Sequence, residues 1–399
     1  MPITAHLHPE PAEGRGWPLT PLGILARHAV ITSRRHAALG CLALLLAVTG
    51  AGAEAADLAA YRRLNVGLAE QHVIPRYEAL AAATAALDED TAAFCAAPGG
   101  AGLDGLRDRF REAQAAWMGV QHLRFGPVQF LLRYDRFAFW PDQRNTAGRH
   151  LGALLAGGDP AALEPRAFAR GSVAVQGFPA LERLLFGKDA AQLTEAGDAA
   201  AFRCRVLRRI AGNLAVMSRG TLDGWRTGDS AYRRVLETTG EDNAYYRDDK
   251  EASLDFFKAF HGSLQMIADL KLARPLGAEA AKAKPRRTES WRSEASLANL
   301  QANLRALEEL YAGPAGFSTL VVSVAGDRDL DQALRDRLKA ALAAAEAIRP
   351  PLSSALGDAE ERGKVERLLA EVRALQGLAT QRLAAALDLP VGFNAFDGD

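Results

Sequence analysis

The chain has 399 residues, no formal net charge, 49% hydrophobic residues and 24% charged residues. This length is enough for two ordinary domains, and the composition is that of a globular protein. The neutral balance of charge argues against nucleic acid or an anionic membrane surface as the partner.

The chain begins with a predicted export signal. Residues 34–36 are Arg, Arg and His, and residues 37–48 form an uncharged apolar run that is too short for a membrane span. Small residues then fit signal cleavage after Ala53 or Ala55. We therefore expect residues 1–53 to be a signal segment with an atypical N-terminal extension. The mature chain is expected to be periplasmic or secreted, with no membrane span.

The rest of the sequence is typical of consecutive helices. Alanine and leucine are abundant, whereas the β-branched residues are sparse, and no segment alternates with a period of two. Pro75 is expected to kink or divide the first helix. The fold class predicted is all-α, with two antiparallel helical bundles at residues 57–227 and 230–390. The expected helices cover residues 58–94, 103–120, 146–155, 165–186, 199–225, 250–272, 297–311, 329–347 and 359–388.

One expected helix carries a carboxylate on an apolar face. Val175, Phe178, Glu182 and Leu185 follow helical spacing, and only Glu182 among them is charged. A carboxylate in such a place must be paired, hydrogen-bonded or protonated, because burying a bare charge is costly. A structural glutamate that holds an arginine and a glutamate that binds a ligand both fit this pattern.

A second expected helix supplies the candidate partners. Its apolar face becomes polar at Gln121 and Arg124, just before a Phe-Gly-Pro break. We predict that Glu182 pairs with Arg124 first or Arg136 second, in a cleft lined by Gln121 and the connector at Trp140. A bidentate arginine would satisfy both charges.

The cysteines offer one covalent link. Cys41 lies in the apolar run of the signal, which leaves Cys95 and Cys204 in the mature chain. An exported chain with two cysteines favours a Cys95–Cys204 disulfide, and two buried free thiols are the alternative.

Three stretches, in this order, resemble motifs of the imelysin-like proteins, also classed as peptidase family M75. Residues 117–127 contain a Trp followed by a Phe-Gly-Pro turn, residues 136–142 contain a Trp-Pro connector, and residues 176–182 lie where the family has its GxHxxE signature. In the second half, residues 271–277 and 291–297 are also similar. The resemblance covers about 57–390. It implies an exported, all-helical protein of two bundle-like domains with the signature glutamate near their interface, a link to iron uptake or regulation, and a peptidase label.

The chain departs from that pattern at the signature itself. Gly177 and Glu182 match, but Pro179 stands in place of the histidine. Histidine and glutamate three residues apart could place two metal ligands on one helix face, and proline cannot ligate. Gln121, where the family often has an acidic residue, is a poor ligand for a hard metal. Glu182 is then the one candidate ligand for iron or another divalent metal, and the ligand spacing does not support such a site. His122 is read either as a hydrogen-bonded or solvated histidine or as a neighbour of the site.

Two functions follow from these residues. The first is a non-catalytic binding or accessory protein of iron or metal uptake or homeostasis, with Glu182, Arg124 and Gln121 lining a polar pocket. Its partners would be components of iron uptake or of outer-membrane or periplasmic transport. The alternative is a metal-dependent peptidase of the M75 type. A metal-activated water needs about three protein ligands around one point, so their convergence separates the two.

Overall fold

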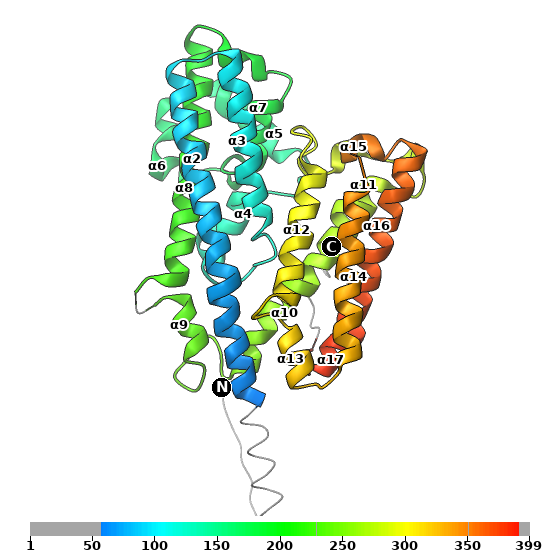
Figure 1. Ribbon diagram of the computed structural model, residues 1–399. Coiled ribbons are helices and arrows are strands. Elements are labelled where there is room, and N and C mark those ends of the chain that lie inside the picture. Colours follow the sequence, from blue (N-terminus) through cyan, green and yellow to red (C-terminus); the bar gives the residue numbers. More distant parts are fainter. Residues whose placement is uncertain (1–56, 229, 350, 391–399) are drawn as a thin grey trace, which may run out of the picture. The chain divides into compact units, whose positions relative to one another are not determined.

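A computed structural model describes residues 57–228, 230–349 and 351–390, and the described residues all belong to one compact unit (Figure 1). The predicted signal segment and its cleavage sites lie outside this range. Within it the regular structure is helical, without strands, as the all-α prediction requires. No helix in these ranges is both long enough and apolar enough to span a bilayer.

The first group of helices packs around a core of aromatic and aliphatic side chains. Helix α2 lies against α3 and α8, and the short α7 lies against α3 and α8. Phe110 of α3 meets Phe178 of α7, and Trp117 stacks on Phe137. The helices of this group are α2 (Ile74–Ala96), α3 (Gly100–Met118), α4 (Arg133–Phe137), α5 (Thr146–Gly157), α6 (Pro165–Arg170), α7 (Phe178–Phe186) and α8 (Asp198–Arg226).

A second group follows along the chain. Helices α14 and α16 lie side by side, and α12 packs against α14, α10 and, from the first group, α3. The predicted division into two bundles at residues 227–230 stays a prediction. The helices of this group are α9 (Tyr232–Glu237), α10 (Asp249–Gln265), α11 (Arg274–Leu276), α12 (Ser296–Ala312), α13 (Ser318–Ser323), α14 (Arg328–Glu346), α15 (Leu352–Ala355), α16 (Ala359–Leu378) and α17 (Ala384–Ala386).

Several long helices contain a turn of π-helix. The helical run that begins at residue 57 passes through a π-turn at Ala69–Val73, directly before Pro75 in the first turn of α2. Similar turns lie at Met266–Ala273, after α10, and at Ala379–Leu383, after α16. A π-turn holds one more residue than an α-turn, and it leaves the helix continuous rather than dividing it.

The single helix expected at residues 165–186 is wrong. The chain there forms α6, a 3₁₀ turn at Val173–Val175, and α7. Gly177 ends the irregular part, and a Cβ atom at this position would lie 2.1 Å from the carbonyl oxygens of Arg136 and Phe137. Only glycine permits so close a backbone approach. Pro179 follows in the first turn of α7, where proline is well tolerated because that turn leaves its N–H groups unused.

A disulfide joins the first group covalently. Cys95 near the end of α2 is bonded to Cys204 in α8, and their Cα atoms are 5.7 Å apart. This separation lies within the range that a disulfide spans. It is the pairing that the sequence favours over two free thiols.

Candidate functional site

Glu182 is buried in α7, with 5% of its surface exposed. Its Oε1 atom accepts three hydrogen bonds, from the backbone N–H of Arg292 at 3.1 Å and from the N–H and the hydroxyl of Ser293, both at 2.9 Å. Burial raises the pKa of Glu182, and these bonds together with the charge of Arg292 oppose that rise. The carboxylate therefore fastens α7 to a segment of chain 110 positions away.

The predicted pairing of Glu182 with Arg124 or Arg136 is wrong. The Nε atom of Arg136 donates to Gln176 Oε1 at 2.5 Å, and one of its terminal nitrogens donates to Asn213 Oδ1 at 3.2 Å. The guanidinium of Arg124 lies over the ring of Tyr134, 4.4 Å from its centroid. Each arginine is thus engaged elsewhere, while backbone N–H groups reach the glutamate.

The segment that receives Glu182 is itself held by buried polar groups. Ser290 and Glu294 both have a left-handed φ of 59°, so residues 289–294 turn back sharply. Gln114 of α3 and Asn299 of α12 both donate to the hydroxyl of Ser290, at 2.6 and 2.9 Å. We call residues 289–293 the anchor segment. Its Ser293 belongs to a stretch that the resemblance singled out, but nothing in the sequence pointed to Glu182 as its partner.

A buried ion pair adjoins the anchor segment. The ammonium of Lys271 lies 2.6 Å from Glu289 Oε2 and also donates to Gln121 Oε1 at 2.7 Å and to Asn303 Oδ1 at 2.6 Å. Gln121 in turn donates to Glu289 Oε1 at 3.1 Å. The lysine also donates to the sulfur of Met118 at 3.6 Å, so its contact with Glu289 is an ion pair beside three hydrogen bonds to other groups. Burial lowers the pKa of Lys271, and Glu289 opposes that shift.

The structure thus brings some of the predicted site residues together and separates others. Gln121 is a neutral bridge inside the Lys271–Glu289 network, and the ring of Trp140 lies 5.9 Å from the lysine nitrogen. Gly177 lies close to the backbone carbonyl groups of Arg136 and Phe137. Lys271 belongs to the site but was not among the site residues predicted from the sequence. A usable signal was present, because Lys271 lies four residues after Ile267 and directly before Leu272, which puts its charge on an apolar stretch of helix.

A second buried cluster contains histidines. The Nε2 atoms of His72 and His122 are 2.8 Å apart, and His72 Nδ1 lies 3.4 Å from Glu309 Oε1. Burial lowers the pKa of His72, and burial with the charges of His72 and Arg76 lowers that of His122 well below its usual value. His122 is therefore a buried, hydrogen-bonded histidine, one of the two readings that its sequence allowed.

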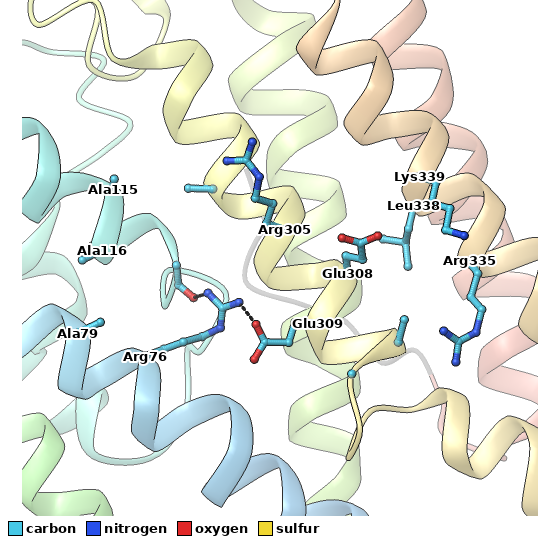
Figure 2. Close-up of a pocket in the computed structure, with 14 residues that line it drawn as sticks. Arg76, Ala79, Ala115, Ala116, Arg305, Glu308, Glu309, Arg335, Leu338 and Lys339 are labelled. Carbon is cyan, nitrogen blue, oxygen red and sulfur yellow. Dashed lines mark hydrogen bonds and ion pairs between the residues drawn. The ribbon is translucent and has the colours of Figure 1, made fainter.

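A cavity of about 680 Å³ opens beside this cluster, and we call it the α12 cleft (Figure 2). Its lining comes from α2 and α3 on one side, from the exposed face of α12, and from α14 on the other side. Small side chains such as Ala115, Ala302 and Gly119 leave the space open. Six charged residues line it: Arg76, Arg305, Arg335, Lys339, Glu308 and Glu309.

The surroundings of Glu182 do not fit a metal ion. N–H and O–H donors already fill its Oε1 atom, and Pro179 offers no ligand one turn earlier. In the part of the chain that the structure describes, no three His, Cys, Asp or Glu side chains are grouped so that they could hold a metal. We derive no chemistry through a metal at this position.

Comparisons with known proteins agree on one family. A family model described as imelysin, peptidase M75, matches residues 73–379. Iron-regulated protein A of Synechococcus elongatus is 26% identical over 249 residues, which are 62% of this chain and 63% of that protein. The match thus spans less than two thirds of that relative.

Two solved structures share the fold. An imelysin-like protein from Psychrobacter arcticum 273-4 has a TM-score of 0.70 at 19% identity, covering 84% of this chain and 98% of that one. A protein from Parabacteroides distasonis, described as an iron-regulated protein A precursor, has a TM-score of 0.67 at 16% identity, covering 80% and 94%. At these identities the likeness concerns the fold alone.

Proposed function

Because the chain belongs to the imelysin family, peptidase M75, we propose that it is an exported, non-catalytic binding or accessory protein of iron or metal uptake or homeostasis. The link to iron rests on the name of the Synechococcus relative, iron-regulated protein A, which is 26% identical to this chain over 249 residues. We place the protein in the periplasm or outside the cell, with components of iron uptake or of outer-membrane or periplasmic transport as its partners.

One observation carries the non-catalytic part of the proposal. The signature carboxylate, Glu182, is bound by the N–H groups of Arg292 and Ser293 and by the Ser293 hydroxyl. A general base or a metal ligand must keep a lone pair directed toward substrate, water or metal. The Oε1 atom, one of the two carboxylate oxygens of Glu182, instead directs its lone pairs into the anchor segment, and Pro179 offers no second ligand one turn earlier, which together support a structural role.

The competing reading, a metal-dependent peptidase, can be separated by experiment. Protein purified from the periplasm of its own host would be assayed for bound metal by mass spectrometry and for hydrolysis of a fluorescent casein, with added iron or zinc. We expect no hydrolysis above a heat-denatured control. A strain lacking the gene should grow more slowly than its parent in iron-limited medium and recover with the wild-type gene.

Two results would contradict this proposal. Hydrolysis that a chelator abolishes and that Glu182→Gln also abolishes would establish the peptidase. Equal growth of the deletion strain and its parent, at every iron concentration, would remove the link to iron.

A further inference from the structure

The α12 cleft has the size of a ligand site and lies apart from the bonds of Glu182. Its volume of about 680 Å³ falls within the range of small-molecule pockets. Figure 2 shows Arg76 and Glu309 turned toward each other on one side, with Arg335, Leu338 and Lys339 on the helix opposite. Between them α12 contributes Arg305 and Glu308.

Two of the charged groups in the cleft neutralise each other. A terminal nitrogen of Arg76 lies 2.5 Å from Glu309 Oε2, and Arg76 also donates to the carbonyl of Gly119 at 3.3 Å. The hydrogen bond from His72 and the charge of Arg76 hold the pKa of Glu309 at about 2. This ion pair is therefore a fixed part of the wall. Because its two charges cancel, the net charge of the cleft depends on the other four charged residues that line it.

Two of those four residues, Arg305 and Lys339, leave positive charge available. A terminal nitrogen of Arg305 lies 3.5 Å from Glu346 Oε1, and both side chains are 57% exposed, so their attraction is weak. Arg335 is held by Asp331 at 3.0 Å. Among the described residues Lys339 and Glu308 form no hydrogen bond or ion pair. The cleft thus offers cations from two helices and one unused carboxylate.

We propose that the α12 cleft binds a small anion that carries at least two carboxylates together with a hydroxyl or amino group. The available cations come from α12 and α14, and a polycarboxylate spreads its charge over several atoms to match them. Phosphate concentrates its charge on one centre. Glu308 repels a bare anion but accepts a hydrogen bond from a hydroxyl or an ammonium group. This assignment does not depend on the proposed role in iron uptake.

Titration calorimetry of the full chain at low salt tests the assignment with three probes. Citrate has three carboxylates and a hydroxyl, tricarballylate has the same carboxylates without the hydroxyl, and inorganic phosphate tests a compact anion. We expect citrate to bind most tightly and phosphate most weakly. Added sodium chloride should weaken citrate binding, since the contacts are exposed to solvent.

Matched variants locate the site. Lys339→Gln should weaken citrate binding about fivefold, the size of one exposed charge contact. Arg337→Gln makes the same change of charge on the same helix, outside the cleft lining and paired with Glu371, and should leave binding unchanged. Glu308→Gln should reduce the difference between citrate and tricarballylate. Ala302→Leu should block binding, because the larger leucine side chain would fill space in the cleft that Ala302 leaves open.

Three outcomes would overturn the assignment. The first is no heat of binding with citrate at millimolar concentration. The second is an equal loss in Lys339→Gln and Arg337→Gln, which would show only a general effect of net charge. The third is phosphate binding as tightly as citrate. Both charge variants are exposed on α14, so circular dichroism should show that they fold like the wild type.

Discussion

At the scale of single residues, the buried carboxylate of Glu182 joins α7 to the anchor segment through bonds to Arg292 and Ser293. Its place on the apolar face predicted that it would be buried and bonded, and it is. The partner could not be found in the same way, because Ser293 lies 111 positions away on a turn with left-handed residues. Periodicity describes one element, whereas a backbone donor on a distant loop leaves no pattern.

The bonds of Glu182 predict a difference between two substitutions. Glu182→Ala strands the N–H groups of Arg292 and Ser293 and should lower the free energy of unfolding by about 3 kcal/mol. Glu182→Gln keeps the shape and a carbonyl oxygen that still accepts those bonds, and should cost about 1 kcal/mol. Urea unfolding measures both, with the exposed Glu195→Ala as a neutral control. Equal losses in the two Glu182 variants would show that the bonds to the anchor segment contribute nothing.

At the scale of elements, hydrophobic periodicity located the long helices well, and α3, α8, α12 and α14 lie close to their expected ranges. It failed between residues 165 and 186, where the apolar spacing continues through a break at Gly177. The close approach of another backbone causes that break, and such an approach is a property of the fold. The π-turns were not predicted either, because the apolar spacing is that of a helix on both sides of each turn.

The contact between His72, in the π-turn at Ala69–Val73, and His122, which follows α3, should make the free energy of unfolding depend on pH. The folded state lowers the pKa values of His72 and His122, so the unfolded chain binds more protons near their usual pKa of about 6.5. The stability that the neutral pair contributes is complete above that pH and is lost as the pH falls. From pH 7.5 to 5.5 we expect a loss of about 1–3 kcal/mol, measured by urea unfolding.

Two variants separate this pair from other titrating groups. His122→Gln should reduce the loss, because one buried histidine is gone. His150→Gln, at an exposed residue bonded to Ser172, should keep the wild-type profile. A wild-type stability that does not change between the two pH values would rule out the explanation.

At the scale of the whole molecule, composition and the absence of alternating segments were enough to predict the all-α class. The sequence alone did not show which helices pack against each other. The α12 cleft lies between helices more than 200 positions apart, and its charged residues each look like ordinary solvated side chains in the sequence. The Lys271–Glu289 pair was hidden for the same reason, since its two members lie on different elements.

The disulfide should contribute substantially to stability. Cys95 and Cys204 are 109 positions apart, and closing a loop of this size in the unfolded chain is worth about 4–5 kcal/mol in the chain-entropy estimate. The double variant Cys95→Ser, Cys204→Ser should lose up to about that amount in urea unfolding. Wild-type protein in reductant should match it. Two thiols that react in the unfolded but unreduced protein would show that the bond does not form.

The π-turn at Ala69–Val73 also sets the rotation of residues 57–68 about the helix axis. One residue of an α-helix corresponds to a rotation of about 100°, so deleting a single residue here would turn residues 57–68 by that angle. Tyr61 now donates to the carbonyl of Leu387 at 2.8 Å, and Asn65 donates to that of Asp249 at 2.7 Å. Both contacts would swing away, and with them the connection between the first described helix and the last. The extra residue thus keeps residues 57–68 in register with the last described helical turn, near Leu387.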